Sequence, residues 1–546
     1  MTDGAPSLVA VAKGATLCEL FAGAAARSEG GFFFHSDGGV LALPPKELYA
    51  RALRRAAQFV GLGIGVGTRV GLVGPNAPEW AEWAWGVWLS GAALVPLPAP
   101  VLMSDPAAFS AEVSSLLRGM GCLVVVGKRW YLEAIGPGPW ATLDWSSRPP
   151  EPLAVHVDVS PSDLATVLST SGSTASPKGV RMTHARAVEW ARCNVIPRRD
   201  GRAAAMVTWF PFHHIAGLGT LFEVAEPAEQ HFLPMKQFLG DPSKWLRLVS
   251  QTRASYAVSP SSVWAEALRG VSENPGGIDL SCLERAVFNA EMVDPEVLER
   301  LQEVCLPLGL PSGAIAVHYA SSEAGMISHT EPTGEVRVDR VDLEVLATSG
   351  KAVPARREGP VKEVVSCGVP YPGTEICIGG PSRPLPEREL GEIWARGPGV
   401  ADGYVNVEDE GRFLDGWLRV GDLGYMAEGE LFVTGRADEV VVHFGHKYNP
   451  EDIEQSVRHA TGLGPGSCLA FSPVGGRPGE LVVLVENDKQ DRDLAGFIIQ
   501  AVARGIGIAP TDVVFVPRGT MPATANGKLQ RSRARAMYAK GELPPG

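Results

Sequence analysis

Closely spaced cysteines are absent from this chain, although it contains eight cysteines in 546 residues. No pair has the spacing of a zinc knuckle or of a Cys-x-x-Cys redox motif. Scattered cysteines in a chain of this length are typical of reduced thiols in a cytoplasmic protein. The first residues also lack a basic segment followed by a long apolar stretch, so we expect no secretory signal.

An excess of positive charge is missing as well. The chain carries 49 Lys and Arg against 61 Asp and Glu, a formal net charge of −12. Because nucleic-acid binding needs a basic surface, we expect no nucleic-acid partner. Residues 83–103 are uncharged, but Gly91, Pro96, Pro98 and Pro100 interrupt them. Proline inside a helix costs about 3 kcal/mol, so this run predicts a β-α-β unit and no membrane span.

Buried strands alternate with helices through the first half of the sequence. Strands are expected at 68–74, 92–97, 164–169, 254–260 and 283–290, and helices at 185–194, from Ser261 and from about Asp294. Asn76 is expected to cap the helix that follows the first of these strands. This alternation predicts an α/β fold with a mostly parallel sheet and helices on its faces.

The residue pattern of the sequence changes after Glu363, where short expected strands are separated by glycine and proline. This composition predicts a β-rich subdomain at about 363–436. A compact α+β piece begins near Gly435. We therefore expect a large N-terminal domain over residues 1–436 and a small, mobile C-terminal domain over residues 437–546.

The stretch LSTSGSTASPKGVRMTH, residues 168–184, follows one of the expected strands. Its hydroxyl groups, its glycine and Lys178 suit a polyphosphate, because amides can approach closely and the lysine adds positive charge. It is not a Walker loop, which needs glycine before the lysine and serine or threonine after it. Here Pro177 precedes the lysine and Gly179 follows it. Taken alone, the stretch fits a phosphate loop and a surface turn equally well.

Five further motifs follow in order: YASSE (319–323), GEIWARGPGVADGY (391–404), WLRVGDLG (417–424), GRADE (435–439) and PATANGKLQR (522–531). Together with TSGSTASPKG they resemble the motifs of the adenylate-forming superfamily, which contains acyl-CoA synthetases, stand-alone adenylation domains and firefly luciferase. The resemblance covers nearly the whole chain. It implies that ATP and Mg²⁺ activate a carboxylic acid to acyl-AMP with release of pyrophosphate.

The resemblance also implies roles for individual residues. Lys528 would be the catalytic lysine, carried to the reaction by closure of the small domain, and His214 would be a second catalytic residue. Glu323 would be catalytic through the Mg²⁺ that it holds. Two anions meet in this reaction, so positive charge near the phosphates is needed. Asp438 would be the hinge between the two half-reactions.

Two further sets of residues are implied by the same resemblance. Nucleotide contacts are expected from Thr170, Ser171, Gly172, Ser173, Thr174, Lys178, Asn289, Ala290, Glu291, His318, Tyr319, Ser322, Asp422 and Arg436. The acid pocket is expected to be lined by Phe212, His213, Gly217, Val258, Ser259 and Ala320. The chain departs from the family pattern at Asn289, where glycine is usual, at His214-Ile215, at Asp438-Glu439 and at Asn449.

Three segments resemble fatty acyl-AMP ligases more than acyl-CoA synthetases: 209–264, 341–373 and 445–454. In those ligases the segment matched by 341–373 is thought to limit the domain motion that CoA use requires. The resemblance therefore implies a fatty or related acid, and transfer of its acyl group to the phosphopantetheine thiol of an acyl carrier protein.

Several alternatives stay open at this point. They are an acyl-CoA synthetase, an amino-acid-type adenylation enzyme, and a non-catalytic nucleotide or acyl binder on the same fold. A phosphate-loop NTPase is disfavoured by the context of Lys178. The basic run at 531–540 fits either attraction of an acidic carrier protein or a solvated last helix.

Overall fold

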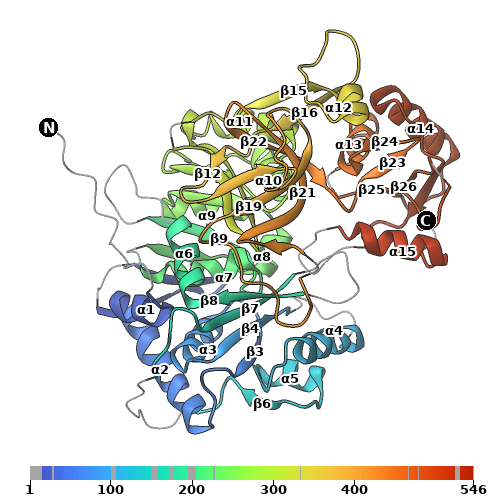
Figure 1. Cartoon of the computed structure of the whole chain (residues 1–546). Coiled ribbons are helices and arrows are strands. Elements are labelled where there is room, and N and C mark those ends of the chain that lie inside the picture. The colour runs from blue at the N-terminus through green and yellow to red at the C-terminus, as the bar shows by residue number, and fades with distance from the viewer. Residues whose placement is uncertain are drawn as a thin grey trace.

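Two large β-sheets form the body of the molecule, and a smaller α+β unit lies at one end (Figure 1). The computed structural model describes residues 15–26, 30–99, 106–148, 157–170, 178–194, 204–225, 228–332, 334–409, 411–464, 466–477, 479–522 and 529–544. Among these residues, no helix is long and apolar enough to cross a membrane.

The first sheet has six strands in the order β6-β5-β3-β4-β7-β8. Their bounds are β3 Arg69–Val73, β4 Ala93–Leu97, β5 Val124–Gly127, β6 Ala141–Asp144, β7 Leu164–Thr170 and β8 Lys178–Thr183. All neighbouring strands pair in parallel except β7 and β8, which are antiparallel. The described ends of the predicted phosphate loop, Thr170 and Lys178, therefore face each other across two strands.

The second sheet has nine strands in the order β17-β14-β13-β12-β11-β9-β10-β1-β2. Their bounds are β1 Gly31–Ser36, β2 Gly39–Leu43, β9 Ala205–Thr208, β10 Glu229–Phe232, β11 Tyr256–Ser259, β12 Arg285–Phe288, β13 Ile315–Ser321, β14 Gly325–His329 and β17 Val369–Pro370. The six strands from β13 to β1 in this order are parallel. The predicted α/β fold with mostly parallel sheets is confirmed.

Helices fill the space between the two sheets and cover their outer faces. One hydrophobic core joins both sheets through α1 (Leu17–Ala26), α2 (Pro45–Gly61), α3 (Pro78–Leu89), α6 (His184–Asn194) and α7 (Ile215–Phe222). A second core packs α8 (Met235–Gly240), α9 (Ser243–Thr252), α10 (Ser261–Glu273) and α11 (Pro295–Cys305) on the nine-stranded sheet. Helices α4 (Pro106–Gly119) and α5 (Arg129–Ile135) pack on the six-stranded sheet.

The next part of the chain forms a five-stranded antiparallel sheet. It contains β18 Glu375–Ile378, β19 Gly391–Arg396, β20 Phe413–Leu414, β21 Trp417–Ala427 and β22 Glu430–Arg436. Before it, a hairpin of β15 (Val338–Asp342) and β16 (Val361–Val365) encloses helix α12 (Leu343–Ser349). The five strands of the sheet lie within 363–436, where short, glycine-broken runs predicted β structure, whereas β15 lies before this range.

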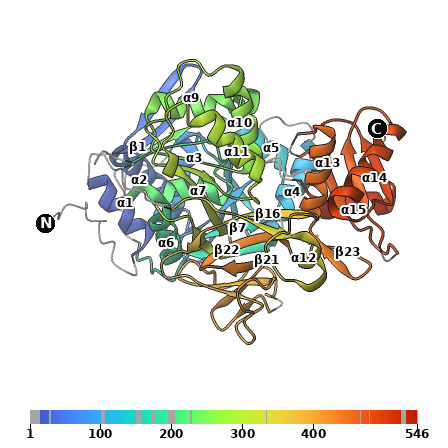
Figure 2. The same cartoon turned by 90° about the horizontal axis from the view of Figure 1, so that it is seen from above.

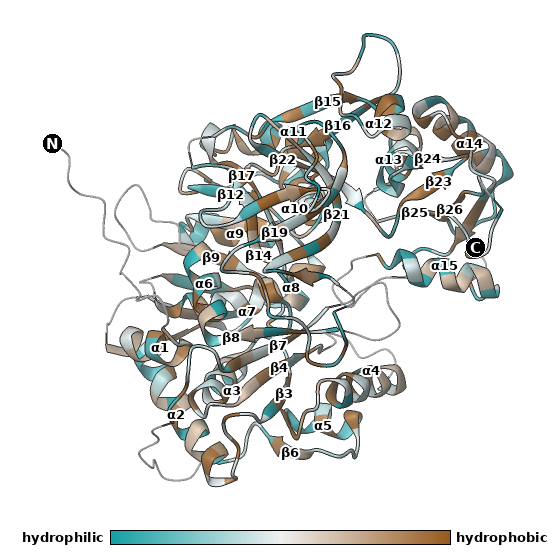
Figure 3. Cartoon of the chain, in the orientation of Figure 1, coloured by the Kyte–Doolittle hydropathy of each residue, from teal (hydrophilic) through white to brown (hydrophobic). Residues whose placement is uncertain are grey.

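The small unit is built from the end of the chain. Its elements are β23 Val441–His443, β24 His446–Tyr448, α13 Pro450–Thr461, β25 Cys468–Phe471, β26 Val482–Glu486, α14 Arg492–Ile506, β27 Asp512–Val516 and α15 Arg531–Lys540. Figure 2 shows this unit beside α4 and α5, and Figure 3 shows hydrophobic residues concentrated along β25 and β26. The small unit thus has one apolar core of its own and a second that it shares with α12.

One sequence expectation is wrong. Asn76 does not cap α3, whose N-cap is Ala77 without a side-chain hydrogen bond. Instead, the Asn76 amide donates to the Phe210 carbonyl at 2.7 Å and accepts from the Phe212 backbone N–H at 2.8 Å. The amide therefore joins the loops after β3 and β9, because two complementary backbone groups there satisfy both of its ends.

The eight cysteines all lie within the described residues, and none forms a disulfide. Five of them are buried. Burial raises the pKa of the Cys122, Cys305 and Cys367 thiols to about 12, so these thiols stay protonated and unreactive at neutral pH. The expectation of buried, reduced thiols agrees with this arrangement.

Candidate active site

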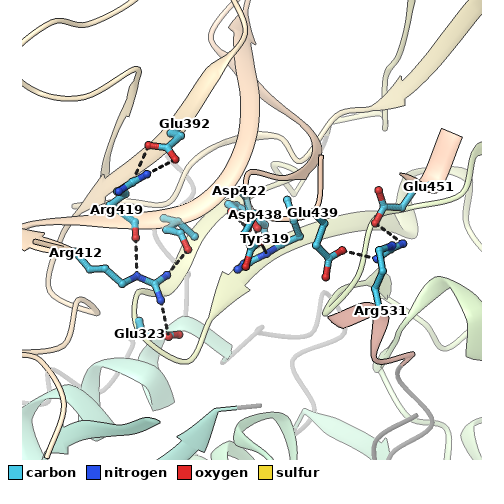
Figure 4. A network of polar contacts seen from close by, with 12 residues as sticks. Tyr319, Glu323, Glu392, Arg412, Arg419, Asp422, Asp438, Glu439, Glu451 and Arg531 are labelled. Atoms are coloured by element: carbon cyan, nitrogen blue, oxygen red, sulfur yellow. Dashed lines mark hydrogen bonds and ion pairs between the residues drawn. The ribbon is translucent and has the colours of Figure 1, made fainter. Parts of the chain in front are cut away.

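Asp422 is held between two residues from different strands. Its Oδ1 accepts a hydrogen bond from Arg436 Nη1 at 2.9 Å, and its Oδ2 accepts one from the Tyr319 hydroxyl. Asp422 on β21 and Arg436 on β22 are direct partners in the antiparallel register, which fixes their approach. Figure 4 shows Tyr319 and Asp422 pointing toward one another. The structure therefore brings together three of the residues predicted to bind the nucleotide.

The electrostatics of this group keep the arginine charged and the tyrosine neutral. Burial alone would lower the pKa of Arg436, but the carboxylates of Asp422 and Asp438 raise it above its ordinary value. Burial and the neighbouring Asp422 raise the pKa of Tyr319 as well. The tyrosine thus stays a neutral donor and the arginine stays a cation. A carboxylate oriented in this way can accept hydrogen bonds from vicinal hydroxyls.

A second group lies around Glu323. Its Oε1 accepts a hydrogen bond from the Tyr404 hydroxyl at 3.2 Å and lies 4.0 Å from Arg412 Nη1. The Lys178 Nζ lies 5.5 Å from the centre of the Tyr404 ring. Figure 4 shows Arg412 directed at Glu323. One carboxylate and two cations therefore gather at the described end of the phosphate loop.

Backbone pairing places these side chains. Strand β8 bridges the loop after β19 through Val180 and Tyr404, and the Gly179 N–H donates to the Asn406 side chain at 2.9 Å. Arg186 is buried and donates to the carbonyls of Gly399 and Ser322. These contacts hold the loop before Glu323 against the loop that carries Tyr404.

The two groups meet at Gly421. This glycine has φ of +93°, and a Cβ there would lie 3.3 Å from Arg412 Nη2 and 3.4 Å from Arg436 Nη2. Only glycine adopts this backbone readily, and its missing side chain leaves room for both guanidinium groups. The Asp422 group and the Glu323 group are therefore neighbours in one site.

Tyr404 and Arg412 were not singled out from the sequence. Tyr404 ends the quoted GEIWARGPGVADGY motif, so a signal for it existed. Arg412 stands outside every motif, and only the fold brings it to Glu323. Its guanidinium is fixed by the carbonyls of Arg419 and Val420, at 3.3 and 2.7 Å. It is thus oriented before any substrate arrives.

The loop after β12 carries Asn289, Ala290 and Glu291, which were predicted to contact the nucleotide. Ala290 has φ of +66°, a left-handed backbone that is unusual for alanine. The buried Asn289 Oδ1 has no hydrogen-bond partner among the described residues. The Glu291 carboxylate accepts from the Ser262 N–H in the first turn of α10. That contact stabilises the helix terminus, so the carboxylate of Glu291 already serves a structural purpose.

Several predicted residues have structural contacts instead of positions beside Asp422 or Glu323. His214 caps α7, its Nδ1 accepting from the Ala216 N–H at 3.2 Å. Phe212 is buried against Trp80 and Phe232, with ring centres at 5.1 and 5.0 Å. A Cβ on Gly217 would lie 2.2 Å from the Pro211 carbonyl, so this glycine permits close backbone packing.

Two other predicted residues lie inside the sheet. The Ser259 hydroxyl accepts from the Trp209 indole N–H at 3.2 Å. Val258 is its neighbour on β11, and adjacent strand residues point to opposite faces, so only one of the two side chains can line a given pocket. His318 is buried, and its Nδ1 lies 3.3 Å from the Tyr256 hydroxyl. His318 and Tyr319 likewise project from β13 to opposite sides.

Some predicted positions are not covered by this description. Ser171, Gly172, Ser173, Thr174 and Lys528 lie outside the described residues. His213, Ser322 and Ala320 lie within them and are partly buried. Their roles stay predictions.

Comparison with known proteins agrees with this geometry. Residues 45–405 match the family model described as AMP-binding enzyme. The chain belongs to the AMP-binding enzyme family. Residues 438–545 match a second model, described as the AMP domain of Disco-interacting protein 2-like proteins. The predicted membership of the adenylate-forming superfamily is confirmed.

Individual members of the AMP-binding enzyme family resemble the chain over most of its length. It is 30% identical to the medium-chain-fatty-acid–[acyl-carrier-protein] ligase JamA of Moorena producens over 71% of this chain and 69% of JamA. It is 27% identical to the long-chain-fatty-acid–AMP ligase FadD26 of Mycobacterium marinum over 90% of both.

A solved structure from the fatty acyl-adenylate ligases of E. coli and L. pneumophila superposes with a TM-score of 0.88. The identity is 28%, with 96% of this chain and 98% of that chain covered. The arrangement of a large N-terminal part and a smaller C-terminal part is therefore shared with this enzyme.

A cluster of ion pairs around Arg531 lies within the small unit. This arginine, three residues after Lys528, pairs with Glu439, with Glu451 at 3.2 Å and with Glu454 at 2.8 Å. Burial raises the pKa of Glu454 to about 7, and the positive charge of Arg531 opposes that rise. Figure 4 shows Arg531 directed at Glu439 and Glu451. The segment that follows the predicted catalytic lysine is thus tied to the predicted hinge region.

The segment 341–373 also contacts the small unit. Lys362 Nζ pairs with the Asp452 carboxylate of α13 and donates to the Thr434 carbonyl at 3.4 Å. Leu343 and Ala347 of α12 belong to the apolar core of the small unit. Apolar and ionic contacts therefore both join this segment to α13 and its neighbours.

Proposed function

We propose that this chain activates a fatty or related carboxylic acid with ATP, forming acyl-AMP and pyrophosphate, and then transfers the acyl group to the phosphopantetheine thiol of an acyl carrier protein. The observation that carries the proposal is the orientation of Asp422 between Tyr319 and Arg436, directly beside the Glu323 group. Family membership and the likeness to fatty acyl-AMP ligases support the same reaction.

In this proposal the nucleotide lies across both groups. Asp422 accepts the two ribose hydroxyls, and Arg436 contacts the same sugar. Lys178 and Arg412 face the phosphates, where their charges offset the negative charge of the triphosphate. The carboxylate oxygen of the acid attacks the α-phosphorus, and the bond to the β-phosphate oxygen breaks as pyrophosphate leaves. When the small domain closes, Lys528 brings a positive charge to the reacting atoms. There it faces the attacking oxygen of the acid and the oxygen that bridges the α- and β-phosphates.

The residues present fit a magnesium ion carried by the nucleotide. Mg²⁺ on nucleotides is usually held by one or two carboxylates together with substrate phosphates. In the described part of the chain, both contacts of the Glu323 carboxylate use Oε1, which leaves Oε2 for a cation. No group of three acidic, histidine or cysteine side chains gathers there for a fully protein-bound metal. When bound, the ion would supply charge neutralisation at the phosphates.

The choice of a carrier protein over CoA rests on the segment 341–373. Its contacts with the small unit, through Lys362 to α13 and through Leu343 and Ala347 in the apolar core, tie the small domain to the body. Rotation about the hinge at Asp438 would have to break them. We infer that the domain moves too little for efficient CoA use. The free cysteines support a reducing, cytoplasmic setting for the reaction.

Acid-dependent pyrophosphate release tests the first half-reaction. A panel of carboxylic acids is incubated with ATP and Mg²⁺, and at least one should give release that depends on both acid and enzyme. If no acid in a broad panel does so, the proposal is wrong. Preformed acyl-adenylate is then offered holo-carrier protein or CoA in parallel. Thioester formation with the carrier protein is expected, and efficient formation with CoA would contradict the assigned acceptor.

A further inference from the structure

Helix α13 of the small unit is held by the body of the molecule at two separate places. Near the start of the helix, the buried Asp452 carboxylate pairs with Lys362 of the segment 341–373. At its end, Arg458 Nη2 lies 3.1 Å from Oδ2 of Asp294, the residue that caps the start of α11. The first contact already supports the proposed acceptor, whereas the second involves no residue of any motif. We call the ion pair of Asp294 and Arg458 the α11 contact.

Asp294 is fixed in place before it meets the small unit. Its Oδ1 accepts a hydrogen bond from the Glu296 N–H at 3.1 Å, and its own N–H donates to Ser261 Oγ, at the start of α10, at 3.1 Å. Its Oδ2 is then directed at Arg458. The Asp294 and Arg458 side chains are 18% and 20% exposed. Because the carboxylate is already ordered, the ion pair loses less side-chain entropy than a pair of free surface residues does.

A neighbouring contact joins the same two helix ends. His459 Nε2 lies 2.8 Å from Glu296 Oε1, although both side chains are more exposed than those of the α11 contact. Arg458 and His459 lie in the last turn of α13, and Glu296 lies in the first turn of α11. Helix dipoles favour basic groups at a C-terminus and acidic groups at an N-terminus. The charges of the two ends are therefore complementary to each other and to their own helices.

The two anchors act on different parts of α13. Asp452 and Arg458 are six residues apart on the helix, which separates them by about 9 Å along its axis and about 120° around it. A unit held at its hinge and at one further point remains free to pivot about the line between them. A second contact on another side of α13 opposes that pivot. A large rotation about the hinge at Asp438 would have to break both contacts.

We propose that the α11 contact is a second determinant of the acyl acceptor, because it holds the end of α13 and opposes the rotation that CoA use requires. This inference rests on the proposed function. The segment 341–373 restrains the small unit from an added hairpin, whereas α11 belongs to the α/β body itself. Since one motion breaks both contacts, their free energies add and their effects on that motion multiply.

Two variants remove the α11 contact from opposite sides. With preformed acyl-adenylate, Arg458→Ala and Asp294→Asn should each raise the ratio of CoA thioester to carrier-protein thioester about three- to fivefold, the range expected for a partly exposed ion pair. Asparagine caps a helix about as well as aspartate, so Asp294→Asn removes the charge and keeps the start of α11. Arg458→Lys keeps the charge and should stay near the wild-type ratio. An unchanged ratio in both Arg458→Ala and Asp294→Asn would overturn the proposal.

A double variant tests whether the two contacts restrain one motion. Lys362→Ala combined with Arg458→Ala should raise the acceptor ratio by about the product of the two single increases. A double variant with no higher ratio than Lys362→Ala alone would contradict the inference.

Controls separate this restraint from a general loss of stability. Val516→Ala weakens the small unit's own core, and Arg504→Ala removes an exposed arginine of α14. Both should keep the wild-type acceptor ratio. If Val516→Ala raises the ratio as much as Arg458→Ala does, destabilisation explains the effect and the inference is wrong. All these variants should keep acid-dependent pyrophosphate release. Release without a change of ratio refutes this inference alone, whereas no release from the wild-type protein with any acid refutes the proposed function itself.

Discussion

Lys362 and Asp452 form an ion pair that is almost completely buried between the segment 341–373 and helix α13. The two side chains are 4% and 10% exposed, and the residues are 90 positions apart in sequence. Burial raises the pKa of Asp452, and the ammonium group of Lys362 opposes that rise. A pair of this kind adds little net stability, but it is sensitive to the loss of either partner. It therefore fixes the position of the small unit more than it strengthens the fold.

Removal of Lys362 should weaken this junction. In Lys362→Ala, the Asp452 carboxylate is left buried without its cation, which costs about 3–5 kcal/mol when both partners are fully buried. We expect a lower urea midpoint for the small unit and, if the junction limits rotation, more thioester formation with CoA relative to carrier protein. Lys351→Ala, an exposed lysine of the same segment, is the control. If Lys362→Ala is destabilised but its ratio of CoA to carrier-protein thioester is unchanged, the ion pair affects stability and does not determine the acceptor.

Substitution of Lys528 should stop the first half-reaction. The proposed role of its charge is transition-state stabilisation, and the loss of one such interaction costs on the order of 10²–10³ in rate. Lys528→Ala should therefore lose acid-dependent pyrophosphate release while ATP still binds, as measured by calorimetry. Lys540→Ala at the exposed end of α15 serves as the matched control. Normal turnover in Lys528→Ala would refute the assigned role.

Substitution of Asp422 should act mainly on nucleotide affinity. Asp422→Ala removes the acceptor for the ribose hydroxyls, and hydrogen bonds to a charged group are worth about 1.5–3 kcal/mol each. The Kd for ATP should rise at least tenfold. Tyr319→Phe removes only the hydroxyl that orients Asp422 and should have a smaller effect. Equal ATP affinity in Asp422→Ala and wild type would exclude the ribose contact.

Glu223 should make stability depend on pH in a predictable direction. Burial raises its pKa from an ordinary value of 4.5 to about 8. Between these values the folded chain holds a proton that the unfolded chain has released, so stability falls as pH rises. The slope from this group is about 1.4 kcal/mol per pH unit, and it vanishes below the unfolded pKa and above the folded pKa.

Glu223→Gln removes this titration. The variant should therefore gain stability relative to wild type as pH is raised from 5.5 to 7.5, as about a 1.4 kcal/mol change per unit in urea unfolding. Glu299→Gln, an exposed glutamate of α11, should show no such trend. A constant difference between Glu223→Gln and wild type across this range would mean that Glu223 is already ionised in the folded chain.

Much of the fold follows from local patterns. Three predicted apolar runs correspond to strands of the six-stranded sheet: 68–74 to β3, 92–97 to β4 and 164–169 to β7. A buried parallel strand needs such a continuous apolar stretch bounded by turn residues. For Asn76, a prediction from local sequence alone was wrong. Its position before a helix predicted a cap, but two backbone groups from the loop after β9 offered a better match.

The motifs also located the nucleotide site only in part. Tyr319, Asp422 and Arg436 were found by their motifs and meet in space. Arg412 carries no local signal, since an arginine in a turn is ordinarily solvated. His318 stands directly before the YASSE motif on β13, yet strand alternation turns its side chain into the sheet beside Tyr256.

The sequence by itself determined the alternating strands and helices, the order of the motifs and the residues available for ATP chemistry, because these depend on short-range periodicity and side-chain type. Only the tertiary structure decided that Lys362 meets Asp452, that Arg412 and Tyr404 reach Glu323, and that His318 meets Tyr256. These partners come from separate elements. Which of them meet depends on how whole sheets and helices pack, and no local stretch of sequence contains that information.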